Sequence, residues 1–404
     1  MRQLFDSPSD MEPLLPVDRD GSLADMATRL AVKTAKLEKS FRPHTRSKVA
    51  QLVRSMNGYY SNLIEGHRTK PHEIENALKG DFSDKKEVRE KQLLHVAHLE
   101  AQEAMENLNL PPEQLVALET IRRIHREIYD RLPSEMRLVD EGKGSHYEVI
   151  PGEIRTHQVS VGRHVAPRYD ALGKFADRFV AFYGEEAAAP AARSFVAAMA
   201  AHHRLVWMHP FEDGNGRVAR LFTHLWIRGI GGGGEGLWTL SRGLARSVDK
   251  YRMALDAADE KRRNDVDGRG YLSEHGLRDF CRFMLTTSLD QVEFMAGLFD
   301  FDGVEQRLTG FCRVQESEDS LPKGSHLVLK QVLLEDEIGR GNVARILNVS
   351  PRTAQPIVGR LLENGFLESP SPKGVLRLAF PPTLRPFLFP DLYPAGSPPP
   401  SARG

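Results

Sequence analysis

The sequence is poor in cysteine and has no long apolar run. Its 404 residues include two cysteines, Cys281 and Cys312, which lie far apart in ordinary apolar surroundings. This spacing excludes a disulfide framework or a cysteine-based zinc site and fits a reducing compartment. No eighteen apolar residues run together, and the acidic, proline-containing start has no apolar signal segment, so we expect no membrane span and no signal peptide. The expected location is the cytoplasm.

The sequence also lacks a net charge. Its 55 Lys and Arg residues balance 55 Asp and Glu residues, and the pI is about 7.3. No overall field would draw such a chain to nucleic acid or to an anionic membrane, so any affinity of that kind has to be local. At this length, two or three domains are expected.

Apolar residues recur at helical spacing through most of the chain, which predicts a mainly α fold. The expected segments are a flexible tail (1–22), an N-terminal helical region (23–110), a helical core (111–311), a polar linker (312–324), a C-terminal module of three helices and two strands (325–392) and a disordered tail (393–404). Within the core, glycines and prolines bracket an alternating stretch from Gly152 to Pro167. This stretch predicts a small β-hairpin.

The stretch HPFEDGNGRVAR, residues 209–220, lies between two strongly apolar helical patterns. Gly214 and Gly216 allow the backbone to approach a ligand closely, and Asn215 can adopt the left-handed geometry that a tight turn needs. The unpaired amides at the start of the following helix are ready hydrogen-bond donors for a phosphate. The sequence therefore predicts an anion site in a loop between two helices.

Four charged or titratable side chains of this stretch add chemistry to the anion site. Arg217 and Arg220 share one face of the second helix, so both guanidinium groups can reach one polyphosphate. Asp213 can hold Mg²⁺ against those phosphates, because this ion takes one or two carboxylates plus substrate oxygens. His209 is the natural proton acceptor at neutral pH. Together they suit phosphoryl or nucleotidyl transfer to a hydroxyl.

This stretch resembles the signature of the Fic family, HPFx(D/E)GN(G/K)RxxR, and matches it at every specified position. The resemblance implies an all-helical core with a β-hairpin flap, and transfer of AMP from ATP to a Ser, Thr or Tyr hydroxyl of a target protein. It implies that His209 deprotonates the hydroxyl, that Asp213 binds Mg²⁺, that Gly214, Asn215 and Gly216 hold the α- and β-phosphates, and that Arg217 and Arg220 hold the β- and γ-phosphates. Members that phosphorylate instead tend to carry lysine in place of Gly216, so the glycine favours AMP transfer.

By the same resemblance, the hairpin at 152–167 is the flap. Its edge residues would be Thr156, His157, Gln158 and Val159. An exposed strand edge offers N–H and C=O groups to an extended target peptide and reads little of its sequence. The alternative is a hairpin that only closes the core.

Two further pairs of residues have open interpretations. Tyr251 and Leu255 lie one turn apart where relatives form the adenine pocket, but such a pair is also typical of a plain core. His95 and His98 lie on a charged helix without further ligands, so a solvated face is the better interpretation than a metal site.

An upstream stretch, YYSNLIEGHRTK, contains Ser61, Glu65 and Gly66 in the pattern (S/T)xxxE(G/N). In a helix, Ser61 and Glu65 share a face, and Gly66 is a plausible stop. The pattern resembles the inhibitory helix of a Fic subgroup, in which the glutamate pairs with the arginine equivalent to Arg220 and misaims the α-phosphate of ATP. The same glutamate can also direct water onto the AMP–protein bond, so removal of AMP and self-modification are further activities implied.

The C-terminal module resembles a winged helix-turn-helix. Ser350 can cap a recognition helix that begins at Pro351. Its outward residues would be Arg352, Thr353, Gln355 and Arg360. Pro356 departs from the usual pattern, because it removes a backbone hydrogen bond from this helix. Binding to DNA, to a protein or to a second copy of the chain all stay open.

The expected protein is thus an autoinhibited adenylyltransferase with a protein hydroxyl as its acceptor. The rival is a DNA-binding regulator that uses the same core as a nucleotide sensor. The intact set of His209, Asp213, Arg217 and Arg220 favours the enzyme, because these residues would be free to drift in a scaffold.

Overall fold

The computed structural model describes residues 5–142, 145–162, 164–230 and 236–392. Over these residues the protein is mainly helical, which confirms the predicted class. The predicted disorder of 393–404 lies outside the described residues.

The secondary-structure elements follow in chain order. The first part contains η1 (Pro8–Met11), α1 (Ser22–Lys39), α2 (Pro43–Ile64), α3 (Pro71–Leu78), α4 (Lys86–Asn107), α5 (Pro112–Leu115) and α6 (Leu118–Tyr129). The middle contains η2 (Ser134–Met136), β1 (Leu138–Gly142), β2 (Ser145–Glu148), β3 (Ser160–Val161), β4 (His164–Val165), η3 (Tyr169–Ala171), α7 (Leu172–Ala187), α8 (Ala191–Met208), α9 (Asn215–Gly229), α10 (Leu240–Arg246), α11 (Val248–Asp259) and α12 (Glu274–Leu298). The last part contains α13 (Phe301–Ser317), α14 (Ser325–Glu335), β5 (Glu337–Ile338), α15 (Arg340–Leu347), α16 (Pro351–Glu363), β6 (Leu367–Glu368), β7 (Leu376–Leu378) and α17 (Arg385–Leu388).

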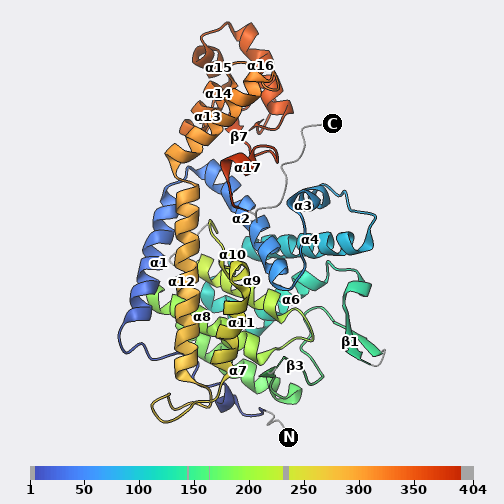
Figure 1. Ribbon diagram of the computed structural model, residues 1–404, viewed down its shortest axis with the longest axis vertical. Coiled ribbons are helices and arrows are strands. Elements are labelled where there is room, and N and C mark those ends of the chain that lie inside the picture. The colour runs from blue at the N-terminus through green and yellow to red at the C-terminus, as the bar shows by residue number, and fades with distance from the viewer. Residues whose placement is uncertain (1–4, 143–144, 163, 231–235, 393–404) are drawn as a thin grey trace.

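The molecule is elongated, with a broad helical body at one end and the C-terminal helices at the other (Figure 1). Helix α8 is the centre of the body and packs against α1, α7, α9 and α12. It is buried on nearly all sides because its sequence is apolar around most of its circumference. Helix α9 buries Phe222 and Trp226 completely. The loop between α8 and α9 is therefore anchored in the core at both ends.

Residues 5–21 lie in the segment predicted as a flexible tail able to pack on another part of the chain, and they are packed on the body. Met11 and Leu14 are 0% and 1% exposed. The hydroxyl of buried Tyr183 donates to the Leu14 carbonyl at 2.5 Å. The segment is ordered because it covers core side chains and supplies them with hydrogen-bond acceptors. Its short acidic sequence does not indicate these contacts.

Two hairpins precede α7. Strands β3 and β4 pair antiparallel, with Ser160 opposite Val165, inside the stretch where a hairpin is predicted. They have two residues each, so residues 156–159 precede the ladder and are not strand, in contrast to the alternation expected from Ile154 onward. The other hairpin, β1–β2, pairs Leu138 with Glu148 and is absent from the sequence prediction.

The C-terminal part differs from its prediction at the linker. Helix α13 continues to Ser317 and so occupies half of the predicted linker at 312–324, because Cys312 on its inner face is buried. The module beyond consists of α14, α15 and α16 with a sheet of order β5-β7-β6. Strand β5, in which Ile338 pairs with Leu376 of β7, is a third strand where the sequence predicts two.

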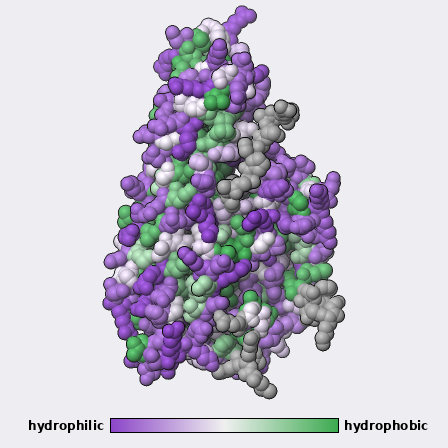
Figure 2. All heavy atoms as spheres, viewed as in Figure 1, coloured by the Kyte–Doolittle hydropathy of each residue, from purple (hydrophilic) through white to green (hydrophobic). Residues whose placement is uncertain are grey.

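The viewed surface is largely hydrophilic, with apolar side chains scattered over it (Figure 2). Among the described helices, none combines the length and the apolar character that crossing a membrane requires. Cys281 and Cys312 are both buried as free thiols, and burial raises the pKa of each to about 12.

Candidate active site

The loop from α8 to α9 turns through two left-handed residues. His209 ends α8 with a φ of 49°, and Gly214 precedes α9 with a φ of 80°. Pro210 disfavours a helical conformation at His209. At Gly214 a Cβ would lie 2.6 Å from the Tyr129 ring, so both conformation and space require glycine there.

Asn215 does not adopt the left-handed conformation predicted for it. It is the first residue of α9, and its buried side chain accepts from the Phe211 N–H at 2.9 Å and donates to the Phe211 carbonyl at 2.8 Å. Its amide group therefore closes the loop. Gly214 adopts the left-handed conformation instead, at no steric cost because it has no Cβ. The N–H groups of Asn215, Gly216 and Arg217 belong to the first turn of α9, and none of them has an acceptor within the helix.

His209 is neutral at physiological pH. Burial, together with His164 and Arg155, lowers its pKa to about 4. The imidazole can therefore accept a proton over the whole neutral range. Arg155, which is 2% exposed, donates from Nε to the His209 carbonyl at 2.7 Å. Its backbone N–H donates to the Pro210 carbonyl at 2.9 Å, so Arg155 ties the base of the predicted flap to this loop.

Asp213 lies in a close cluster with Tyr129 and Arg217. The Tyr129 hydroxyl donates to Asp213 Oδ2 at 2.5 Å, and Arg217 Nη2 donates to the same oxygen at 3.0 Å. Burial acts to raise the pKa of Asp213, but Arg217 and Tyr129 outweigh it, so the pKa lies below its usual value. The side chain is an ionised carboxylate that stays 52% exposed beside the start of α9.

This single carboxylate fits Mg²⁺ brought in with phosphates, which supply the remaining oxygens. In the described part of the chain, no group of three or more His, Cys, Asp or Glu residues could hold a metal by itself. Asp213 is thus the residue that would hold the ion, together with oxygens of the substrate.

Glu65 and Arg220 are brought together from α2 and α9. Arg220 Nη2 donates to Glu65 Oε1 at 2.5 Å, and Arg220 Nε donates to Ser61 Oγ at 2.9 Å. The arginine side chain is 2% exposed and the glutamate 36%. Burial acts to raise the pKa of Glu65, yet the charge and hydrogen bond of Arg220 outweigh it and lower the pKa. Gly66 follows the pair with a φ of 89°, which a residue with a side chain rarely adopts.

Gly216 lies directly beneath this ion pair. A Cβ at Gly216 would lie 2.5 Å from Glu65 Oε1 and 2.9 Å from Arg220 Nη1. The absent side chain therefore makes room for the glutamate.

Residues 115–227 match the Fic/DOC family model. Over 118 residues the chain is 32% identical to the protein adenylyltransferase Fic of Drosophila ananassae, an alignment covering 29% of this chain and 21% of that protein. Its counterpart in Drosophila yakuba is 35% identical over 105 residues, which are 26% of this chain and 20% of that protein. The chain thus spans about a fifth of the length of the curated relatives that it matches.

Among solved structures, Fic-1 (aa134–508) from C. elegans is similar with a TM-score of 0.50 and 18% identity, over 69% of this chain and 72% of that one. At this identity the similarity shows a shared fold. The matched residues 115–227, called the Fic segment below, contain α6 to α8 and nearly all of α9, with the loop between the last two.

Residues 156–159, predicted as the edge of the flap, hydrogen-bond to neighbouring segments, while Thr156, His157 and Gln158 stay exposed. Glu212 Oε1 accepts from the Thr156 N–H at 3.0 Å and lies 2.8 Å from His157 Nδ1. Gln158 and the Val159 carbonyl both bond to the chain just after β4. These contacts hold residues 156–159 irregular and explain why they form no strand. The exposed edge is one step further on, at Ser160 and Val161 in β3.

His125 is a functional neighbour that the sequence analysis missed. It is stacked between Tyr129 and Phe211, at ring-centroid distances of 4.3 and 4.1 Å. Its Nδ1 accepts from the Gly152 N–H at 2.8 Å, which leaves Nε2 to donate to the Asp213 carbonyl at 3.3 Å. Burial lowers the pKa of His125 to about 3, so it is a neutral spacer in a fixed tautomer. The sequence feature that could have indicated His125 is its place on the inward face of α6.

The pair Tyr251 and Leu255 lies on α11, beside α8. Tyr251 is 3% exposed, and its hydroxyl lies 2.8 Å from His202 Nε2. Burial raises the pKa of Tyr251 to about 12. Tyr251 is thus buried beside both His202 and Arg220, whereas Leu255 stays partly exposed, and the adenine-pocket interpretation stays a prediction.

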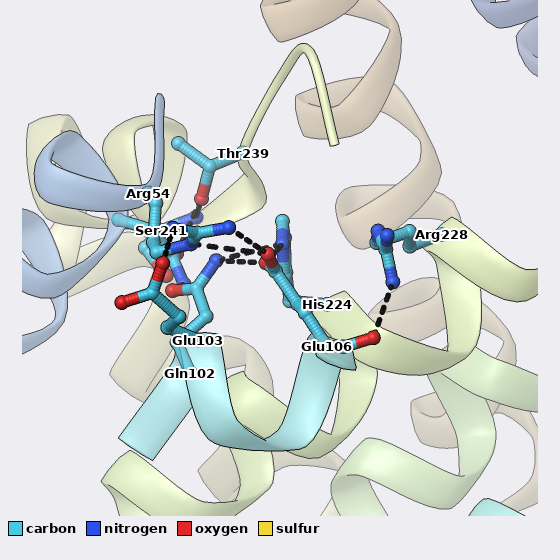
Figure 3. A network of polar contacts seen from close by, with 9 residues as sticks. Arg54, Gln102, Glu103, Glu106, His224, Arg228, Thr239 and Ser241 are labelled. Atoms are coloured by element: carbon cyan, nitrogen blue, oxygen red, sulfur yellow. Dashed lines mark hydrogen bonds and ion pairs between the residues drawn. The ribbon is translucent and has the colours of Figure 1, made fainter. Parts of the chain in front are cut away.

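A buried polar network joins α2, α4, α9 and α10 beside the Fic segment (Figure 3). Glu106 on α4 accepts from Arg54 at 2.8 Å and from Gln102 at 2.7 Å, and it lies 3.4 Å from His224 on α9. Burial acts to raise the pKa of Glu106, but His224 and Arg54 lower it to about 2. The network holds the helix that carries Glu65 against the helix that carries Arg220.

The prediction of a solvated face for His95 and His98 is wrong. The two are 1% and 0% exposed, because α2 covers this face of α4. A Cβ at Gly58 on α2 would lie 3.3 Å from the His98 ring, so the glycine allows the close approach. Burial lowers the pKa of His95 to about 3 and that of His98 also, so both are neutral core residues.

Proposed function

We propose that this protein is an adenylyltransferase that transfers AMP from ATP to a Ser, Thr or Tyr hydroxyl of a protein, and that Glu65 inhibits it from within the chain. The observation that carries the proposal is the Glu65–Arg220 ion pair beside a complete HPFEDGNGRVAR loop. The names of the Drosophila relatives support the same reaction class.

In the proposed reaction, the triphosphate lies at the N-terminus of α9, where amides and the helix dipole favour an anion. The acceptor hydroxyl attacks the α-phosphorus, the bond from that phosphorus to the oxygen bridging to the β-phosphate breaks, and pyrophosphate leaves. His209 takes the hydroxyl proton, as its lowered pKa allows. Mg²⁺ held by Asp213 would neutralise phosphate charge.

The inhibition follows from competition for Arg220. Since Glu65 occupies this guanidinium, the γ-phosphate would lose its partner, and the α-phosphorus would be presented to the acceptor in the wrong place. A misplacement of about 1 Å can cost on the order of a hundredfold in rate. Removal of AMP, with Glu65 directing a water molecule, is a second activity that the same arrangement supports.

Gly216 favours AMP transfer over phosphorylation. Kinase-like relatives tend to carry lysine here, but any side chain would meet Glu65 Oε1 at 2.5 Å. A lysine could not coexist with the inhibitory carboxylate as it lies in this chain.

The target peptide would pair with the edge of β3. Ser160 and Val161 are both exposed, and Val161 is 51% exposed. Because main-chain pairing reads little sequence, specificity would come from elsewhere on the target.

The test uses ATP labelled separately at the α- and the γ-phosphate, with Mg²⁺, on the wild type, Glu65→Gly and His209→Ala. We expect α-label on protein to rise strongly in Glu65→Gly and to vanish in Glu65→Gly/His209→Ala, while ATP binding persists. Glu363→Gly, at the exposed end of α16, is the matched control. Label from the γ-phosphate would identify a kinase, and nucleotide binding without transfer would support the rival nucleotide sensor.

The rival, DNA binding through the C-terminal module, has one observation in its favour. Arg352, Thr353, Gln355 and Arg360 on α16 are all exposed, as a recognition helix requires. A gel shift with random duplex DNA at low salt tests this role. Loss of the shift in Arg352→Ala/Arg360→Ala would support it, and absence of any shift would leave the surface to a protein partner.

A further inference from the structure

Helix α2 begins without a capping side chain of its own. Its N-cap residue is Arg42, which makes no side-chain cap hydrogen bond, and Pro43 follows. The first turn of a helix has N–H groups without intrahelical acceptors, and a Ser, Thr, Asp or Asn at the N-cap normally accepts from them. The sequence at this end therefore leaves donors to be satisfied from elsewhere.

Asp336 of the C-terminal module supplies the missing cap. Its carboxylate accepts from the His44 N–H at 2.8 Å and from the Thr45 N–H at 3.0 Å. It also accepts from the Thr45 hydroxyl at 2.8 Å. These are the two amides that a local N-cap side chain would satisfy, and the negative charge also complements the helix dipole.

The backbone conformation and the burial of Asp336 both restrict the position of its carboxylate. It lies between α14 and β5, is 9% exposed, and has a φ of 70°, which non-glycine residues seldom adopt. Two further contacts tie the same end of α2 to the module: His44 Nε2 lies 3.1 Å from the Leu378 carbonyl, and Lys48 pairs with Glu368 at 2.6 Å.

The other end of α2 carries the inhibitory residues. Ser61 and Glu65 contact Arg220 there, and Arg252 of α11 donates to the Ile64 carbonyl at 3.2 Å. One continuous helix of 22 residues thus joins the two ends, a span of about 33 Å. Since a helix moves as a rigid rod, a change of tilt at Asp336 displaces Glu65.

The junction at Asp336 is not fully packed. A pocket of about 240 Å³, partly open to solvent, lies next to Thr45, which Asp336 contacts, and is also lined by Phe301 and Leu334. This unfilled volume gives the side chains that line it room to rearrange when the module shifts against α2.

We propose that Asp336 is a positioning residue for the inhibitory carboxylate, so that the C-terminal module sets the strength of inhibition through α2. The inference rests on the proposed function, because it concerns the regulation of the same site. A partner that draws the module away from α2 would weaken the Glu65–Arg220 pair and activate transfer.

The test compares Asp336→Ala with Asp336→Asn, which keeps an acceptor oxygen without the charge. The rate of self-modification with α-labelled ATP is measured in the wild-type and in the Glu65→Gly background. In the wild-type background we expect Asp336→Ala to raise the rate roughly fivefold, the factor that loss of one helix cap corresponds to, and Asp336→Asn to raise it less. In the Glu65→Gly background we expect no change.

Asp319→Ala is the matched control, because Asp319 also has a positive φ, 55°, but is exposed and is not in the α2 junction. Hydrogen exchange of the full chain gives a second readout. If Asp336 acts through α2, Asp336→Ala speeds exchange both at residues 44–46 and at residues 61–66.

Two outcomes would overturn the inference, and a third would overturn only the proposed function on which it rests. Faster exchange confined to residues 44–46, with an unchanged rate, would make Asp336 a local cap only. An equal effect in the Glu65→Gly background would show that it does not act through Glu65. No transfer by the Glu65→Gly protein itself would refute the proposed function instead, and exchange at residues 61–66 would still decide the coupling.

Discussion

Replacing Gly216 by alanine should displace the Glu65 carboxylate, the proposed inhibitory group, from Arg220. The new Cβ would lie 2.5 Å from Glu65 Oε1, and an ordinary contact begins at 3.4 Å, so this oxygen has to withdraw by about 0.9 Å. The nearest atoms are the ends of two flexible side chains, Glu65 and Arg220, so they yield and the backbone stays in place. The substitution therefore places a methyl group between Glu65 and Arg220.

The size of the effect follows from the bond that is lost. A hydrogen bond between charged groups contributes about 1.5–3 kcal/mol, and about 1.4 kcal/mol corresponds to a factor of ten. We therefore expect Gly216→Ala to raise self-modification about tenfold or more. The melting temperature should fall slightly, because the gain of about 1 kcal/mol from alanine in a helix offsets only part of the lost bond.

The assay is transfer of α-labelled AMP in four proteins: wild type, Gly216→Ala, Glu65→Gly and the double variant. In the Glu65→Gly background there is no carboxylate to displace, so Gly216→Ala should give no further gain. A lower rate in both backgrounds would refute the reasoning, because it would mean that the methyl group obstructs the phosphates and not the glutamate.

Three further outcomes are expected. The pKa of His209 is lowered to about 4, so its neutral form persists above that pH. We therefore expect kcat/KM of the Glu65→Gly protein to stay flat from about pH 8 down to about pH 5.5 and to fall only nearer pH 4. A fall in kcat/KM with a midpoint near pH 6.5 would contradict this. Tyr129→Phe removes a hydrogen bond to Asp213, so urea unfolding should show a loss of about 1 kcal/mol and more Mg²⁺ should be needed for activity; an unchanged Mg²⁺ requirement would count against a metal role for this carboxylate. Leu14→Ala should cost about 2–5 kcal/mol of unfolding free energy, whereas Val17→Ala, at a position 51% exposed, should cost under about 0.5 kcal/mol; equal small losses would mean that the N-terminal segment is not part of the core.

Much of the candidate site could be predicted because its parts are adjacent in the sequence. Residues 209–220 form one loop and one helical turn, so chain connectivity alone places a histidine, an aspartate and two arginines within reach of one ligand. Helical periodicity likewise predicted the mainly α fold and placed Ser61 and Glu65 on one face.

Several residues around the loop could not be predicted, because they come from distant parts of the chain. Arg155 holds the His209 carbonyl, and Tyr129 binds Asp213 across 84 positions of sequence. No local spacing indicates such contacts. The hairpin lies within the predicted stretch, but the place of its strands could not be predicted: residues 156–159 are not strand, and the Thr156 N–H donates to Glu212, 56 positions further along the chain.

The sequence by itself determined that the chain is mainly helical and that twelve consecutive residues combine a histidine, a carboxylate and two arginines. Only the tertiary structure decided which faces are covered. His95 and His98 lie on a charged helix and are nevertheless buried, because α2 packs over them. Asp336 caps α2 by accepting from the N–H of His44, 292 residues earlier in the chain. Periodicity records that a face is apolar or charged, whereas the neighbour that buries or caps it is chosen by the packing of the whole chain.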